Sequence, residues 1–242
     1  MAGGGTRWGG AQAPIGWQSA RVGAGLSGEM TGVSAYLVPA RSAIAEIEVK
    51  RSRFRCTLER VETEEAARGV VDRVRREHWD ARHHCSAFVL GPDAGTQRSS
   101  DDGEPSGTAG APMLEVLRGR EVSDVVAVVT RWFGGVLLGT GGLVRAYGDA
   151  VRAALDDAGL SRRRLVTEYA VRLPLADAGR VDGQLRARGI PVREVSYAEQ
   201  PAAVIHAAEP VGESPTLAAL VAELTGGSGL VEPTGTRWVD AS

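Results

Sequence analysis

The stretch VSDVVAVVTRWFGGVLLGTGGLVRAYGDA, residues 122–150, decides how the first half of the chain folds. Its beginning, VSDVVAVVT (122–130), is the most apolar segment of the sequence and predicts a central strand that is buried on both faces. The glycine-rich residues that follow predict a loop. Residues 143–159 then predict a helix, because apolar side chains recur there at every fourth position. This stretch therefore indicates a domain in which a sheet packs against helices.

Apolar periodicity predicts further elements on the amino-terminal side of this stretch. Alternating apolar and polar residues over 44–61 predict one or two strands, with Ile44 among the side chains that face the core. Thr63 is expected to cap the next helix, because a threonine oxygen can accept a hydrogen bond from a free amide of the first turn. The other expected elements are a helix ending at His78, a strand over 84–91, a polar connection over 92–107 and a short helix ending at Gly119.

The basic run SRRR (161–164) marks the expected boundary between two domains. Beyond it the pattern predicts the order βαββαβ, which is the ferredoxin-like arrangement. Residues 1–29 are rich in glycine, show no helix or strand period and are expected to be disordered; Met30, directly after them, is a candidate translation start. The expected division is 1–29 as an extension, 30–162 as the first domain and 163–242 as the second.

Composition excludes some classes of protein. The formal net charge is −2, which argues against a strongly basic nucleic-acid binder. Residues 165–242 hold more acidic than basic side chains, so this half would be repelled by phosphate backbones, whereas RNA contact through the first half stays open. Two cysteines without a CxxC pair favour a reduced, cytoplasmic compartment. No apolar run approaches the roughly 18–20 residues of a membrane span, so no membrane partner is expected.

The acidic stretch SSDDGEPSGTAG, residues 99–110, is the first candidate site. The carboxylates of Asp101, Asp102 and Glu104 could hold Mg²⁺ or transfer protons. The alternative is an exposed turn, since Asp, Gly, Pro and Ser favour turns for stereochemical reasons. Residue types alone do not choose between these interpretations.

The glycine-rich stretch RWFGGVLLGTGGL, residues 131–143, is the second candidate. It joins a strand to a helix, where backbone N–H groups favour an anion, and Arg131 and Arg145 flank it. It does not fit a P-loop, because Thr140 stands where that motif has lysine. The alternative role for its glycines is tight turning and close packing.

Two shorter patterns complete the candidates. On a strand, His83 and Cys85 would share one face, but no further ligand stands at a usual spacing, so no metal is expected. A nucleophilic thiolate is disfavoured, since cysteine is usually a small buried residue, and His83 is expected to make hydrogen bonds. In KRSRFR (50–55), Arg53 could belong to an RNA-facing stripe or to an ordinary solvated face.

Four segments together carry a resemblance. The runs SRF (52–54), ARHHCSAF (81–88), SDDGEPSGTAGAPML (100–114) and VVTRWFGGVLLGTGGLVRAYGDA (128–150) resemble the IMPACT/YigZ family in order and spacing. The resemblance implies an α+β chain: a ribosomal-protein/elongation-factor-G-like β-α-β domain followed by a ferredoxin-like βαββαβ domain. Eukaryotic relatives regulate translation under amino-acid stress, and nucleic-acid or ribosome binding is the usual inference for bacterial members.

The expected function is therefore a non-enzymatic, translation-associated regulator that binds RNA, the ribosome or a translation factor. One alternative is an enzyme acting on a phosphorylated or carboxylated small molecule, and another is a protein-interaction module using the acidic second domain. We expect Arg131 or Arg145 to neutralise Asp101 or Asp102, with His83 nearby. No catalytic residue, cofactor or metal is implied, and the oligomeric state stays open. The expected binding residues are Arg53, His83, Asp101, Asp102, Glu104, Arg131, Gly134, Gly135, Gly139, Thr140, Gly141, Gly142 and Arg145.

Overall fold

The structure, a computed structural model, describes residues 18–19, 32–198, 201–212 and 217–241. Within the extension expected to be disordered, only Gln18–Ser19 (β1) is described, as a strand, and the rest lies outside the described residues. The chain divides into two compact units. Unit 1 contains Arg41–Gly159, and unit 2 contains residues 32–40 together with the described residues from Leu160 onward.

The expected domain boundaries are wrong at one point. The expected first domain includes residues 30–40, but Ala35–Pro39 (β2) pairs antiparallel with Leu160–Pro174 (β8) of unit 2. The backbone groups of β2 find their hydrogen-bond partners on β8, over 160–164. A five-residue strand carries no sequence signal for a partner so far along the chain.

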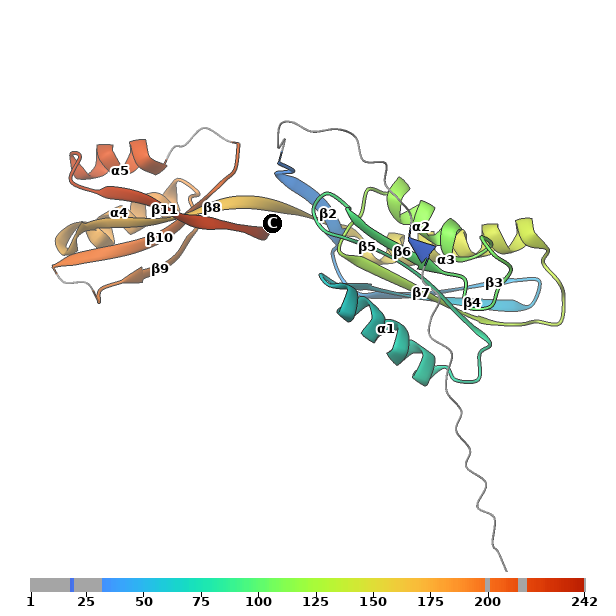
Figure 1. The fold of residues 1–242 in the computed structure, drawn as a ribbon. Coiled ribbons are helices and arrows are strands. Elements are labelled where there is room, and N and C mark those ends of the chain that lie inside the picture. The colour runs from blue at the N-terminus through green and yellow to red at the C-terminus, as the bar shows by residue number, and fades with distance from the viewer. Residues whose placement is uncertain (1–17, 20–31, 199–200, 213–216, 242) are drawn as a thin grey trace, which may run out of the picture. The chain divides into compact units, whose positions relative to one another are not determined.

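Unit 1 is one antiparallel sheet with helices on both faces. The strand order is β1-β6-β5-β7-β4-β3, and β7 lies inside the sheet between β5 and β4, as expected for the most apolar strand. Figure 1 shows α1 on one face of this sheet and α2 with α3 on the other. The bounds are β3 Ala43–Val49, β4 Ser52–Arg60, α1 Glu64–Glu77, β5 His83–Leu90, β6 Thr96–Ser100, α2 Gly110–Gly119, β7 Val125–Trp132 and α3 Thr140–Ala158.

Two expectations for unit 1 are wrong. The segment expected as a polar connection contains the strand β6, whose Gln97 and Ser99 side chains are buried; a strand of polar residues lacks the alternation that reveals strands. Ile44 is 55% exposed rather than in the core. The register pairs its neighbour Ala43 with the buried Leu58, and this places Ile44 on the opposite face.

Unit 2 confirms the ferredoxin-like arrangement. Its described elements run β8, α4, β9, β10, α5, β11, and the strand order β11-β8-β10-β9 places the first strand beside the third. Both helices pack on one sheet face, around a core that includes Val171, Ile205 and Val221. The bounds are a 3₁₀ turn at Leu175–Asp177, α4 Ala178–Ala187, β9 Val192–Ser196, β10 Ala202–Pro210, α5 Leu217–Thr225 and β11 Leu230–Ala241.

Candidate functional site

Asp101 is a helix cap. Its Oδ1 accepts hydrogen bonds from the amides of Ala109 (3.1 Å) and Gly110 (2.8 Å), where α2 begins, and its Oδ2 accepts one from Gly107 (2.8 Å). A carboxylate in this position also interacts favourably with the positive end of the helix dipole. With both oxygens engaged by backbone amides, Asp101 has a structural role and is poorly placed to hold a metal or transfer protons.

Asp102 is also engaged within the protein. Its Oδ1 accepts a hydrogen bond from Arg75 Nη2 (2.6 Å) of α1, and its Oδ2 accepts one from the backbone amide of His84 (2.7 Å). The Asp102 carbonyl accepts a hydrogen bond from His83 Nδ1 (2.9 Å). Burial acts to raise the pKa of the Asp102 carboxyl, but the His84 hydrogen bonds and the Arg75 charge prevail, so its pKa lies below the ordinary 3.8.

This lowered pKa makes unfolding pH-dependent. A carboxyl whose pKa is lower in the folded state adds stability above its unfolded pKa, and loses it as the pH falls through the folded value. We expect Asp102→Asn to reduce the free energy of unfolding by about 1–3 kcal/mol at pH 7, the range for hydrogen bonds to charged groups. The deficit should shrink toward zero once the pH falls well below 3.8.

Urea unfolding of wild type and variant at stepped pH values measures this difference. The matched control is Asp72→Asn, because Asp72 is exposed on the same helix as Arg75 and should change stability by less than about 0.5 kcal/mol at every pH. A deficit for Asp102→Asn that stays constant from pH 7 to the acid limit would contradict the assignment.

Glu104 sits in a buried polar cluster. Its Oε1 accepts hydrogen bonds from Arg131 Nη1 (2.6 Å) and from the Tyr147 hydroxyl (2.8 Å), and the Glu104 and Arg131 side chains are only 4% and 8% exposed. The Cys85 sulfur lies 3.0 Å from the Asp101 carbonyl and 3.3 Å from the Tyr147 hydroxyl. Burial raises the pKa of both Cys85 and Tyr147, so both stay protonated at neutral pH. The cluster fixes the acidic loop to the sheet and to α3.

The expected pairing of these charges is therefore wrong in its partners. Arg131 neutralises Glu104, and neither Asp101 nor Asp102. The partner of Asp102 is Arg75, which belongs to α1 and was not among the expected residues. Arg145 is exposed on α3 and makes no ion pair among the described residues.

Gly134 and Gly135 shape the first turn of the glycine-rich loop. The Gly134 amide donates to Ser52 Oγ (3.1 Å), and a Cβ on Gly134 would lie 2.0 Å from the carbonyl carbon of Arg51. The loop therefore presses against the turn between β3 and β4. Gly135 has φ +82°, a conformation that glycine adopts without strain.

The end of the same loop starts α3. Gly139 is the residue before the helix, with φ +73°, and no side chain caps the first-turn amides there. Thr140, Gly141 and Gly142 form the first turn; Thr140 and Gly141 are exposed, and a Cβ on Gly141 would meet nothing within 4 Å. Gly141 therefore leaves open space in this turn, whereas a Cβ on Gly142 would lie 3.0 Å from Leu138 Cβ.

Trp132, the last residue of β7, contacts the loop after α1 and the neighbouring strand β4. Its Nε1 donates to Asp80 Oδ2 (2.8 Å), and its ring packs edge-on against His78 at 5.3 Å between centroids. The Arg53 guanidinium lies over the Trp132 ring, 4.4 Å from its centroid, as a cation–π pair. Arg53, an expected site residue, is thereby placed beside an aromatic platform.

The aromatic–basic surface is our name for Arg53, Trp132 and exposed residues of three segments: the turn between β3 and β4, the loop after α1 and the loop after β7. Trp79, between His78 and Asp80 in the sequence, is 82% exposed. Phe133 is 51% exposed, and its ring centroid lies 5.7 Å from the Arg131 guanidinium carbon. Lys50 and Arg51 are exposed in the turn that Gly134 contacts, and neither makes an ion pair among the described residues. The surface consists of Lys50, Arg51, Arg53, Trp79, Trp132, Phe133 and Leu137, which is 82% exposed.

Sequence reasoning found only part of this surface. It selected Arg53 and the neighbouring glycines but not Trp79, Phe133 or Leu137. A usable signal was present, because the sequence HWD places a large apolar residue between two polar ones at the expected end of a helix. His83 is half-buried and engaged with Asp102, so it belongs to the interior hydrogen bonds rather than to this surface.

The described part of the chain was searched for metal-ligand groups and for helices long enough to cross a membrane. Its residues hold no group of three or more His, Cys, Asp or Glu side chains that could ligate a metal ion. None of its helices combines the length and the apolar character needed to span a membrane.

Known proteins resemble this chain in sequence and in fold. Residues 50–155 match the Impact N-terminal domain. The chain is 44% identical over 154 residues to "IMPACT family member YvyE" of Bacillus subtilis (strain 168), covering 64% of this chain and 71% of that protein. It is 50% identical over 139 residues to "IMPACT family member YigZ" of Escherichia coli (strain K12), covering 57% and 68%. A solved structure described as "Crystal structure of an hypothetical protein" has a TM-score of 0.56 and 38% identity, covering 82% of this chain and 96% of that one.

Proposed function

Because the chain belongs to the IMPACT family, we propose that it is a translation-associated regulator whose unit 1 binds single-stranded RNA through the aromatic–basic surface. The family resemblance supports the link to translation. The observation that carries the choice of RNA is the exposure of Trp79 and Phe133 together with that of Lys50 and Arg51, two cations that make no ion pair among the described residues.

This combination suits a flexible, negatively charged strand with unpaired bases. Every base offers a π-face, so exposed aromatic rings bind single strands by stacking without strict sequence preference. Trp132 is held by Asp80 and His78 and is covered by Arg53, while the Phe133 ring contacts the Arg131 guanidinium. Lys50 and Arg51 can then attract the phosphates by charge.

The contacts of the acidic loop favour RNA binding over catalysis. Asp101, Asp102 and Glu104 each bind amides, arginines or a tyrosine of this chain. None of the three offers a free carboxylate to abstract a proton, which weakens the alternative of an enzyme acting at this loop. We assign the acidic loop the role of support for the neighbouring surface.

Fluorescence anisotropy with a labelled uridine oligonucleotide, at rising salt, tests the proposal. Trp79→Ala and Phe133→Ala should each weaken binding roughly tenfold, since stacking contributes about 1–3 kcal/mol per base. Arg51→Gln should weaken binding and lower the slope of log affinity against log salt by about 1. Co-sedimentation with ribosomes under the same salt series extends the measurement to assembled RNA.

The matched control is Tyr197→Ala, which removes an aromatic side chain of unit 2 that is 51% exposed, as Phe133 is. It should leave RNA affinity unchanged. The proposal fails if neither the oligonucleotide nor ribosomes bind at low salt, or if Tyr197→Ala weakens binding as much as Phe133→Ala.

A further inference from the structure

Unit 2 contains a small cavity that the proposed function does not use. It lies on the sheet face opposite α4 and α5 and has a volume of about 160 Å³. Its lining combines charged side chains with Pro191 and Ala208. A cavity of this size accommodates a small anionic group.

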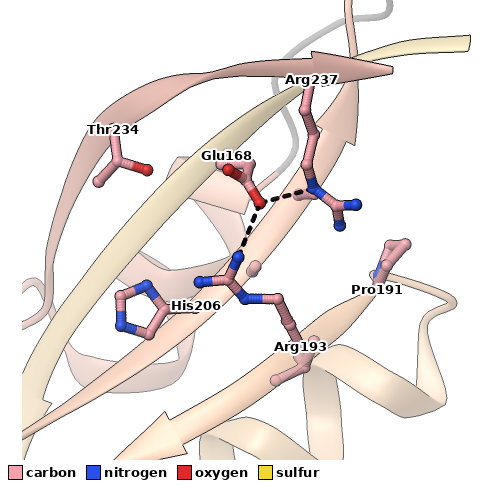
Figure 2. Close-up of a pocket in the computed structure, with 9 residues that line it drawn as sticks. Glu168, Pro191, Arg193, His206, Thr234 and Arg237 are labelled. Atoms are coloured by element: carbon pink, nitrogen blue, oxygen red, sulfur yellow. Dashed lines mark hydrogen bonds and ion pairs between the residues drawn. The ribbon is translucent and has the colours of Figure 1, made fainter. Parts of the chain in front are cut away.

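Two arginines converge on one carboxylate oxygen in this cavity. Glu168 Oε1 accepts hydrogen bonds from Arg237 Nε (2.7 Å) and from Arg193 Nη1 (3.4 Å). Figure 2 shows both guanidinium groups beside Glu168, with the His206 ring near Arg193. The other N–H groups of both arginines make no hydrogen bond among the described residues. Several donors are therefore free to serve an anion.

The two guanidinium groups of Arg193 and Arg237 share a single carboxylate, that of Glu168. Glu168 holds two like charges together, but one carboxylate neutralises only one of the two guanidinium groups. The Arg193 and Arg237 side chains are 55% and 45% exposed, so a ligand from solvent can reach them. The Thr234 hydroxyl also lines the cavity, whereas the His206 Nε2 faces a second carboxylate, Glu194 Oε1, at 3.8 Å.

We propose that this cavity binds a single phosphate group. Guanidinium groups recognise phosphate through paired N–H donors, and donors from several sides suit an oxyanion with several oxygens. The excess of acidic residues over 165–242 repels an extended phosphate backbone, so the ligand is one phosphate group rather than a nucleic-acid duplex. The source is free phosphate, or the terminal phosphate of a monoester whose remainder stays outside the cavity.

Isothermal titration of the full chain in low-salt buffer tests this site with three probes: inorganic phosphate, adenosine 5′-monophosphate and adenosine. Both phosphates should bind at millimolar concentrations, and adenosine should not. Arg193→Gln and Arg237→Gln should each lower phosphate affinity about tenfold, as expected for loss of one charge-assisted contact. Tighter binding of the monophosphate than of phosphate identifies the monoester as the source, and equal binding identifies the free ion.

Glu168→Gln gives the sharpest readout. It keeps an oxygen that accepts the arginine hydrogen bonds but removes a negative charge, so phosphate affinity should rise roughly three- to tenfold. A purely structural role for Glu168 would not strengthen anion binding. The matched control is Arg172→Gln, because Arg172 of β8 lies opposite Leu230 of β11, has its Nε 3.8 Å from Glu232 Oε2 and does not line the cavity.

The proposal is overturned if neither phosphate binds, if adenosine binds as well as its monophosphate, or if Arg172→Gln reduces affinity as much as Arg193→Gln. Circular dichroism of each variant distinguishes lost binding from lost folding. The RNA proposal is tested separately, because Trp79→Ala should leave phosphate titration unchanged and Arg193→Gln should leave oligonucleotide binding unchanged. Failure of one proposal does not imply failure of the other.

Discussion

Replacing Glu104 with alanine is expected to lower the free energy of unfolding by about 3–5 kcal/mol, because it leaves a buried arginine without its counter-charge. Arg131 is 8% exposed at its side chain, and its ion pair among the described residues is with Glu104. The Tyr147 hydroxyl would lose its acceptor at the same time. Urea unfolding at pH 7 measures the loss, and a reduced yield of folded protein is itself an expected sign of it.

A double variant distinguishes the effect of an unpaired buried charge from the effect of lost side-chain volume. Replacing both partners, as in Glu104→Leu with Arg131→Met, should recover part of the stability, since buried ion pairs can often be exchanged for apolar residues of similar volume. Glu115→Ala is the matched control, because Glu115 is exposed and should change stability by less than about 0.5 kcal/mol. The buried-pair argument would be wrong if Glu104→Ala were as mild as that control.

Gly134→Ala is expected to reduce stability by about 4 kcal/mol or more, which is among the largest effects of single substitutions. The added Cβ would lie 2.0 Å from the Arg51 carbonyl carbon, 2.1 Å from its oxygen and 2.4 Å from the Ser52 nitrogen. All three atoms belong to the backbone, so no side chain can rotate away. Either the turn between β3 and β4 or the loop after β7 must move.

The control for this substitution is Gly141→Ala in the same loop-to-helix segment. A Cβ on Gly141 would meet nothing within 4 Å, and α3 already includes this residue, so alanine should leave stability unchanged or raise it by about 0.5–1 kcal/mol. Thermal unfolding of both variants provides the comparison. Equal melting temperatures would show that the contact with Arg51 carries no constraint.

Periodicity revealed the elements that bury apolar side chains. The strand expected over 122–130 is β7, and the helix expected over 143–159 is α3, which begins at Thr140. The apolar pattern does not indicate this earlier start, because Gly141 and Gly142 carry no side chains that could extend it. The strand β6 was missed for a related reason, since its buried residues are polar.

The partners of the charged residues could not be predicted in the same way. Asp102 meets Arg75, and Glu104 meets Arg131, each across 27 residues of sequence. Such pairs depend on how α1 and β7 pack around the acidic loop, and no local spacing encodes that packing. The stretch 99–110 predicts a functional loop, but its three carboxylates bind amides and arginines of the protein itself.

The pairing of β2 with β8 has a consequence for how the protein assembles. In the order of synthesis, residues 41–159 are made between these two strands, so this segment of unit 1 is inserted between two paired strands of unit 2. Arg41 Nη2 donates to the carbonyl oxygen of Asp157 (2.6 Å) and to its carboxylate (2.7 Å), which holds the two ends of the inserted segment together. Folding of unit 1 therefore brings Pro39 to Leu160 and closes a long loop before β8 needs its neighbour. The order of assembly that this favours is the insertion first and the surrounding sheet second.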